Sequence, residues 1–483
     1  MTQRLAIAFG INAILLPLVV AGQALGEPAA EVRAFPTAEG FGTSTVGGRG
    51  GRVIAVTNLN DAGPGSLRQA MEAETGPRVV VFRTGGTIAL RGPITVREPN
   101  SFLTVAGQTA PGGGIQLKNH GIDLRDGARD VVIRHLRIRP GIDGVTPENQ
   151  GDIDAVTLWG NRGTRVRNVV IDHCSLAWAV DENANAWGEV TDTTFQWCII
   201  AEGATEGHHK GPHSMGMLVS GGDRGERITL SVHHCLFAHN AGRNPLVARA
   251  DVVDFRNNVV YNWSGNNFAA FGEWTLDHSA RVNFVNNHYL KGPQSTGGGD
   301  NVAWLAGSGT KVYTEGNWGP AIPEGSADGW AIGFLDIEKN YRVRVNTPAS
   351  AAQFRSHTPF PAPAVTTRPT GELLDALLAD VGASRALRDA VDRRIVEEVR
   401  QRSGQVGIGS DYPRLAAGTP PVDTDGDGIP DEWEQARGLD PHDPADGAVI
   451  SSNGYTHLEN YLNELAGDPI PGNPYGPHRQ EEE

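Results

Sequence analysis

Acidic residues stand in two neighbouring segments of the central sequence, and basic residues follow them. The acidic residues are Asp152 and Asp154 in GDIDAV, and Asp181 and Glu182 in AVDEN. The basic group is Lys210, His213, Arg243 and Arg249. Carboxylates that lie close together cost free energy unless a cation or a proton intervenes. A divalent cation held there beside fixed positive charge would suit an acidic sugar, bridged to the protein by Ca²⁺.

A repeat in the sequence predicts how these residues come together. The chain has three cysteines, in VIDHCSLA, TFQWCIIA and SVHHCLFA, and the series continues with DFRNNVVYN and NFVNNHYL. Short β-forming strings that recur about every 20 to 50 residues predict a solenoid, here a parallel β-helix. Like residues then stack from coil to coil. We therefore expect the cysteines to be buried free thiols, and we expect amide ladders between Asn258 and Asn287 and between Asn257 and Asn286.

A second series of strands runs through the same coils and carries the charged residues. It consists of DAVTLWG, AVDENAN, MGMLVSG and PLVARAD, which begin at 154, 179, 215 and 245. Stacked strands lie about 4.8 Å apart, so the carboxylates of one coil face those of the next. The next two coils bring the basic residues to the same corner. This spacing predicts one groove lined by carboxylates and then by cations.

Composition and the two chain ends suggest an exported protein of several parts. We expect a signal peptide at 1–26, a β-helix at 27–345, a Pro-rich segment with packing helices at 346–418, a calcium-loop module at 419–466 and a disordered tail at 467–483. The net charge of -15 argues against nucleic acid as a partner. No later stretch suits a membrane span, and we expect a secreted monomer.

Two regions are expected to support the solenoid. Residues 67–73 predict a short helix that caps its first end. Residues 372–399 show helical periodicity, interrupted at Gly382, with an apolar face that should pack against the coils. That face contains Leu373, Leu377, Val381, Leu387, Val391 and Ile395.

Other polar residues of the coils are assigned no chemistry. We expect Asp172 and His173 to orient a turn inside the coil, and Glu202 and Glu206 to be loop charges. The histidines between 208 and 239 leave a zinc site open as an alternative, although no pair shows the helical H-x-x-x-H spacing.

The string DTDGDGIPDEWE matches the calcium-loop pattern D-x-D-x-D-G-x5-E. A hard dication needs several oxygen ligands, which alternating Asp side chains, a main-chain carbonyl and a bidentate Glu supply. The expected ligands are Asp423, Asp425, Asp427, the carbonyl of Ile429, Asp431 and Glu434. We interpret this loop as a structural clip of a small separate module.

The strings GDIDAV, VVIDHCSLAWAVDEN, IIAEGATEGHHKGPHSMG and LFAHNAGRNPL resemble the pectate lyase family of polysaccharide lyases. The resemblance implies a right-handed parallel β-helix, a Ca²⁺ cofactor and cleavage of polygalacturonate by β-elimination. It implies that Arg243 is the catalytic base, and that Lys210 and Arg249 contact the substrate. The calcium ligands that it implies are Asp152, Asp154 and Asp181.

The chain departs from the family pattern at two places. Ala177 stands where the family has an acidic metal ligand, so Glu182 would have to substitute for it. The spacing near Lys210 requires an insertion, which makes His213 a rival for that position.

Three classes of function stay open on the sequence alone. The first is a calcium-dependent lyase acting on an acidic polysaccharide, and the second is a glycoside hydrolase that uses paired carboxylates. The third is a noncatalytic carbohydrate-binding β-helix. Arginine is an awkward base because its guanidinium stays protonated at ordinary pH, so His213 or Lys210 could remove the proton instead. Arg243 could also simply pair with Asp251 or Asp254.

Overall fold

The structure is a computed structural model. It describes residues 32–148, 153–222, 226–264, 268–272, 279–296, 299–307, 309–326, 328–336, 347–349, 351–383, 387–407, 411–472 and 474. The expected signal peptide and Asp152 lie outside these residues. Within the described part, no helix combines the length and the apolar character needed to cross a membrane.

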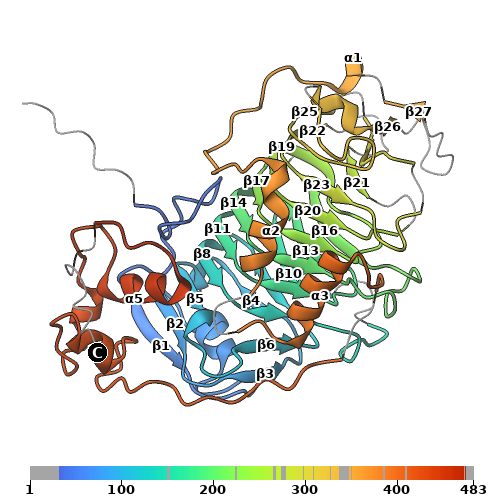
Figure 1. Ribbon diagram of the computed structural model, residues 1–483. Coiled ribbons are helices and arrows are strands. Elements are labelled where there is room, and N and C mark those ends of the chain that lie inside the picture. Colours follow the sequence, from blue (N-terminus) through green and yellow to red (C-terminus); the bar gives the residue numbers. More distant parts are fainter. Residues whose placement is uncertain are drawn as a thin grey trace, which may run out of the picture. The chain divides into compact units, whose positions relative to one another are not determined.

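Three parallel sheets wind around one interior, one strand of each sheet per coil (Figure 1). Sheet A contains β1 (Arg52–Val56), β2 (Arg78–Phe82), β5 (Leu103–Ala106), β8 (Arg129–Arg134), β11 (Val166–Asp172), β14 (Val190–Gln196), β17 (Ile228–His233), β22 (Ala280–Val285) and β25 (Lys311–Glu315). Sheet B contains β3 (Gly86–Ala89), β6 (Ile115–Lys118), β9 (Arg137–Ile138), β12 (Ser175–Ala177), β15 (Ile199–Ala201), β18 (Leu236–Ala238), β20 (Val259–Tyr261) and β23 (His288–Leu290). Sheet C contains β4 (Ile94–Val96), β7 (Ile122–Arg125), β10 (Val156–Gly160), β13 (Glu182–Gly188), β16 (Met215–Ser220), β21 (Ala269–Phe271), β24 (Ala303–Leu305) and β26 (Phe334–Asp336), and β27 (Thr347–Pro348) pairs with β26 in the antiparallel sense. The long β19 (Leu246–Arg256) begins in sheet C and ends in sheet A.

The repeats stack as the sequence predicts, which confirms the parallel β-helix. The three cysteines are free and buried in the interior. Asn258 donates to the side chain of Asn287 at 3.1 Å, and Asn287 donates to that of Asn317 at 2.9 Å, so this amide ladder is one coil longer than expected. Asn257 and Asn286 form no side-chain ladder: the Asn257 amide donates to the main-chain carbonyl of Asn286 at 3.3 Å, and both amides donate to the carbonyl of Arg368.

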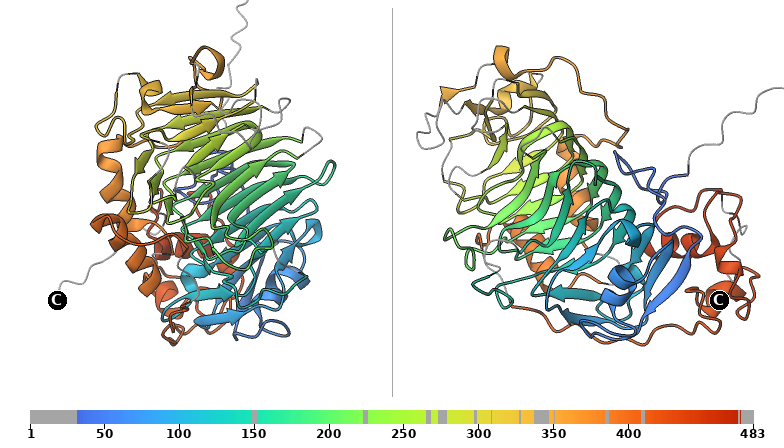
Figure 2. Two further views of the ribbon diagram at one scale, coloured as in Figure 1. Left: turned by 90° about the vertical axis from the view of Figure 1, so that its right-hand side faces the viewer. Right: turned by 180° about the vertical axis from the view of Figure 1, so that it is seen from behind.

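Helices cover the outside of the coils and close their ends. They are α1 (Ala351–Phe354), α2 (Thr370–Asp380), α3 (Ala390–Gln401), α4 (Asp431–Gln435) and α5 (His457–Ala466), with single turns at η1 (Gln69–Ala73), η2 (Glu98–Asn100), η3 (Gly107–Thr109), η4 (Gly329–Ile332) and η5 (Asp446–Ala448). Figure 2 shows α2 and α3 along one side of the stack. They pack their apolar faces against sheet B, as expected. Leu387 does not join this face; it is 71% exposed because it lies in the turn before α3.

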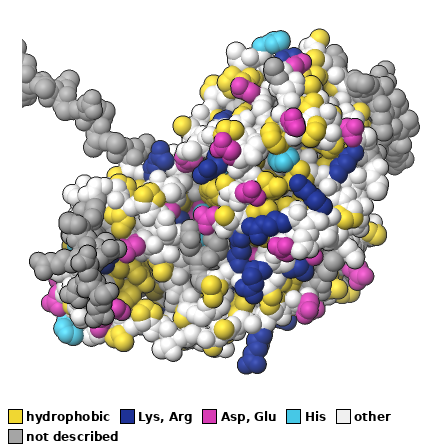
Figure 3. All heavy atoms as spheres, viewed as in Figure 1, with side chains coloured by type: hydrophobic (Ala, Val, Ile, Leu, Met, Phe, Trp, Pro, Cys, Tyr) yellow, Lys and Arg dark blue, Asp and Glu magenta, His cyan; other side chains and the backbone are white. Residues whose placement is uncertain are grey.

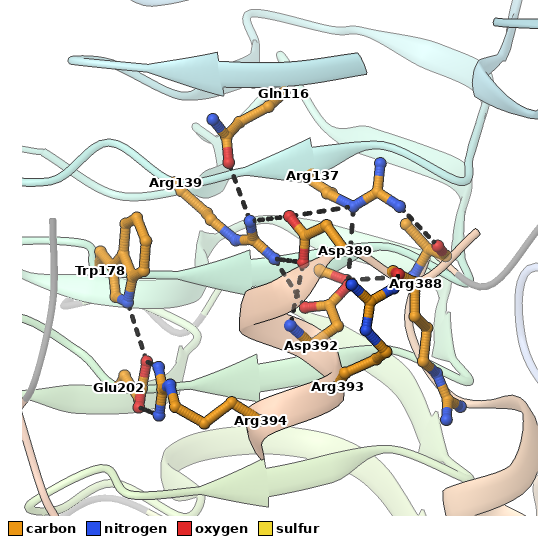
Figure 4. A network of polar contacts seen from close by, with 12 residues as sticks. Gln116, Arg137, Arg139, Trp178, Glu202, Arg388, Asp389, Asp392, Arg393 and Arg394 are labelled. Carbon is orange, nitrogen blue, oxygen red and sulfur yellow. Dashed lines mark hydrogen bonds and ion pairs between the residues drawn. The ribbon is translucent and has the colours of Figure 1, made fainter. Parts of the chain in front are cut away.

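A buried ion network fixes the start of α3 on the coils (Figure 4). Arg139 is fully buried, and its guanidinium lies 2.7 Å from a carboxylate oxygen of Asp392. Asp389 contacts the same guanidinium and caps α3 by accepting the Asp392 N–H. Ser175 of β12 donates to Asp392 at 2.6 Å. The network therefore ties the charges at the start of the helix to groups of the coils.

Glu202 belongs to this interface as well, so its interpretation as a loop charge is wrong. It is fully buried, and its carboxylate accepts from the Trp178 indole at 2.9 Å and from Arg394 of α3 at 2.7 Å.

Figure 3 shows Lys and Arg side chains gathered on the face where α3 lies.

The C-terminal segment packs on the first coils instead of forming a separate module. Ile429, Leu458 and Leu462 contact the outward-facing Val79 and Val81 of β2. These valines are buried only because the segment covers them.

The ordered chain also continues beyond the expected end of this module. Asp468, placed by sequence in a disordered tail, is paired with buried Arg134 at 2.8 Å and accepts from Thr37 at 2.6 Å. The boundary expected at 466 therefore falls too early.

Asp172 and His173 form a buried charged pair in a turn of the coil. His173 lies 2.9 Å from Asp172, which also accepts from Arg134 and Gln196 at 2.7 Å each. Burial lowers the pKa of His173, but the charge of Asp172 outweighs it and brings that pKa up to about 9. Burial alone would raise the pKa of Asp172, and His173 and Arg134 hold it well below its usual range.

Replacing Asp392 by Ala should lower the free energy of unfolding by about 3–5 kcal/mol, because it leaves buried Arg139 short of a partner. Chemical denaturation would measure the change. Asp375→Ala is the control, since Asp375 is exposed on neighbouring α2. Equal stability of the two variants would contradict the importance of the network.

The His173–Asp172 pair should make stability depend on pH. The pKa of His173 is raised from 6.5 to about 9 on folding, so its contribution is complete below pH 6.5 and is lost as the pH rises to about 9. His173→Gln should remove this decline and reduce stability at pH 6 by up to about 3 kcal/mol. The control is His442→Gln at an exposed position. A decline that persists unchanged in His173→Gln would show that another group titrates.

Candidate active site

Asp154 lies just before β10, at the edge of sheet C, and is held by three donors. Its carboxylate accepts from the Thr157 hydroxyl at 2.8 Å, the Glu182 N–H at 2.9 Å and the Asn185 amide at 2.9 Å. Thr157 and Asn185 are register partners on β10 and β13, so the pairing of two coils builds this arrangement. Burial, and then the charge of Asp181, raises the pKa of Asp154 to about 7.

Asp181 and Glu182 come from the start of the next coil and meet Asp154 as the sequence predicts. Ligand oxygens of the three residues all lie within 4.8 Å of one another. Asp181 also lies 2.8 Å from Nε2 of His213. Burial alone would raise the pKa of Asp181, but the hydrogen bond from His213 and the charge of Arg243 bring it below its usual range.

Arg243 reaches the carboxylates from the turn before β19. Its guanidinium contacts Glu182 and lies 3.7 Å from Asp181, and its side chain is 25% exposed. Burial lowers the pKa of Arg243, although Asp181 and Asp154 oppose this shift. The guanidinium therefore lies among the carboxylates of Asp154, Asp181 and Glu182. It is exposed enough for an acidic group of a substrate to reach it.

The simple ion pair considered for Arg243 is not formed. Asp251 lies 3.3 Å from Arg227, and Asp254 lies 2.5 Å from Arg256.

The structure separates the remaining basic candidates. His213 contacts Asp181, whereas the side chain of Lys210 is exposed and its N–H donates to Nδ1 of His208 at 3.1 Å. Arg249 lies in β19 and donates to the carbonyl of Gly222. Of these candidates, His213 reaches the carboxylate group, through Asp181.

Sequence reasoning considered His208 only among the histidines of a possible zinc site, and it missed Thr157 and Asn185. His208 stacks on His213 with ring centroids 3.9 Å apart, its Nε2 lies 3.8 Å from Asp181, and these three residues form a group that could hold a metal ion. Thr157 and Asn185 hold Asp154, and the equal spacing of Thr157 from Asp154 and of Asn185 from Glu182 was the available signal. Ala177 lies in sheet B, buried under α2 and α3, so it does not face the groove.

The donor set suits a hard divalent cation. Asp154, Asp181 and Glu182 supply carboxylate oxygens at one point, which is the chemistry that Ca²⁺ prefers. Burial is the largest cause of the raised pKa of Asp154, and the repulsion from Asp181 that adds to it is what such a cation would relieve. Arg243 already neutralises part of this charge through Glu182.

A second group of carboxylates lies in the C-terminal segment. Asp423, Asp425 and Asp427 converge there, as the calcium-loop pattern predicts. Asp427 and Glu434 are joined by Asp446 of η5, a residue outside the pattern. The carboxylate of Asp431 instead accepts from the Thr424 N–H and hydroxyl, both at 2.7 Å.

The fold and the groove together define a parallel β-helix with an acidic, arginine-containing site on the edge of one sheet. The chain is 34% identical to a probable pectate lyase C of Aspergillus fumigatus, over 93% of this chain and 97% of the relative. It is also 34% identical to one of Aspergillus terreus, over 89% and 94% of the two chains. The chain belongs to the pectate lyase family, and is thus a polysaccharide lyase by descent.

The search of solved structures finds pectate lyases at lower identity. A pectate lyase of Bacillus sp. N165 in complex with trigalacturonate has a TM-score of 0.46 at 16% identity, covering 71% of this chain and 98% of that one. A pectate lyase bound to hexasaccharide has a TM-score of 0.49 at 13% identity, covering 75% and 100%. No family model matches the sequence.

Proposed function

We propose that this protein cleaves polygalacturonate, or a closely related uronate polymer, by calcium-dependent β-elimination. The observation that carries the proposal is the meeting of Arg243 with Asp154, Asp181 and Glu182 at one edge of sheet C. Family membership supports the lyase class over a glycoside hydrolase or a noncatalytic binder.

The reaction needs a base at C5 of the sugar and a way to neutralise the charge that develops on the adjacent carboxylate. Ca²⁺ held by Asp154, Asp181 and Glu182, with Asp152 as a further ligand, would supply much of that neutralisation. Arg243 takes the C5 proton, the C–H electron pair becomes the C4–C5 double bond, and the C4–O bond breaks. The departing oxygen takes up a proton, so an unsaturated end and a hydroxyl end result.

Arg243 is the favoured base because of what surrounds it. Burial lowers its pKa, which increases the fraction of neutral guanidine available at alkaline pH. His213 donates to Asp181 and therefore orients a metal ligand, which leaves it less suited to remove the proton. Lys210 and Arg249 remain our candidates for contacts with substrate carboxylates further along the groove.

We also infer that residues 1–26 direct export and that the mature protein acts as a secreted monomer, either outside the cell or in the periplasm. The apolar run near Ile11–Val20 with small residues after it supports a secretory signal. Amino-terminal sequencing of protein recovered from the culture medium would test the cleavage near residue 26.

Activity should depend on added Ca²⁺, because three carboxylates must be bridged before an acidic sugar can approach them. The assay follows the ultraviolet absorbance of the unsaturated product, which also separates a lyase from a hydrolase. Chelation should abolish the signal and Ca²⁺ should restore it. Undiminished turnover after confirmed metal loss would remove the metal bridge from the mechanism, and reducing ends without absorbance would indicate hydrolysis.

Arg243→Lys should lower kcat by about a hundredfold or more with folding intact, because it keeps the charge but loses the planar guanidinium and its reach. The control is Arg227→Lys, since Arg227 is exposed and pairs with Asp251, away from the carboxylate group. The variants should be compared across the pH range. An Arg243→Lys enzyme with wild-type turnover at every pH would show that another group takes the proton.

A further inference from the structure

Glu434 presents a buried carboxylate that lacks a partner. Its side chain is fully buried on α4, and neither carboxylate oxygen has a hydrogen-bond donor in the part of the chain that the structure describes. Oxygens of Asp427 and Asp446 lie within 4.8 Å of it and of each other. Removing carboxylates from water without donors or a cation costs several kcal/mol per group. The arrangement therefore needs a cation or protons to offset its charge.

The three carboxylates point to a hard divalent cation. All available ligands are oxygens, and further oxygens of Asp423 and Asp425 lie on the adjoining loop and share Asp427 with this group. Gly447 packs directly behind Asp427, so that a side chain at 447 would collide with the Asp427 carboxylate. Asp446 is thus brought in by η5, and it takes the place that the sequence pattern gives to Asp431.

The same loop also forms the contact between the C-terminal segment and the β-helix. Ile429, two residues after Asp427, is fully buried against β2. Gly428 has φ +92° and lies against Val53 and Val81, where an added Cβ would come within 3.1 Å of Val53. Asp423 pairs with Arg83 at 3.5 Å, directly after β2. The backbone conformation that gathers the carboxylates is therefore the one that seats the segment.

We propose that a divalent cation, with Ca²⁺ as the fitting ion, binds between Asp427, Glu434 and Asp446 and fastens the C-terminal segment to the first coils of the β-helix. This site is separate from the groove and does not depend on the proposed reaction. Without the cation, repulsion among the carboxylates opens the loop and releases Ile429 and α5 from β2.

The first test counts the metal ions bound to the full-length protein, using Ca²⁺ as the probe and native mass spectrometry. Glu434→Gln and Asp446→Asn should each bind fewer Ca²⁺ ions than the wild type. Glu432→Gln is the matched control, because Glu432 is exposed on the same helix. Asp181→Asn should lose the groove ion only, which separates this proposal from the proposed function. An unchanged ion count in Glu434→Gln would overturn the site.

The second test measures hydrogen exchange in the wild type with Ca²⁺ and with excess chelator. Chelation should speed exchange in α5 by about tenfold or more, since its contact with β2 is lost. Exchange in α3, which the buried ion network holds, should not change. Unchanged exchange of α5 after confirmed metal loss would overturn the fastening role, and Glu434→Gln should already exchange fast in the presence of Ca²⁺.

Discussion

The constraint on which the rest depends is the common register of the coils. Each strand pairs in parallel with the equivalent strand one coil away, so a residue fixed in one coil fixes the height of its neighbour. Thr157 and Asn185 reach the same carboxylate only because β10 and β13 pair without a shift. A one-residue slip would turn these side chains to the other face of the sheet.

The same register that stabilises the fold concentrates charge at the groove. Backbone pairing forces Asp154 and Asp181 together although their repulsion is unfavourable, and this repulsion adds to burial in raising the pKa of Asp154. Arg243, brought by the turn before β19, relieves part of it. The site thus combines a cluster of carboxylates that destabilises the fold with an arginine that the proposed reaction uses.

Buried charge recurs away from the groove, where every member has a partner. Arg139 pairs with Asp392, and Asp172 pairs with both His173 and Arg134. These networks fix where α3 and the C-terminal segment sit on the coils. Glu434 is different, because its two carboxylate oxygens have no hydrogen-bond donor within the described part of the chain. This contrast is the reason for proposing a cation site there.

Much of the architecture and part of the site could be predicted from sequence. Repeating strings determine the strands and their stacking, because identical local patterns bury the same face in every coil; this gave the cysteine positions and the approach of Asp154 to Asp181. The sequence could not decide contacts between segments far apart in the chain. Leu387 fits a helical period but lies before the start of α3. Glu202 was expected to be a loop charge but accepts from Arg394. Asp446 lies outside the calcium-loop pattern but meets Asp427 and Glu434 of that pattern. Only the tertiary structure decided these, because packing of one segment on another chooses which polar groups lose water and which partners they then find.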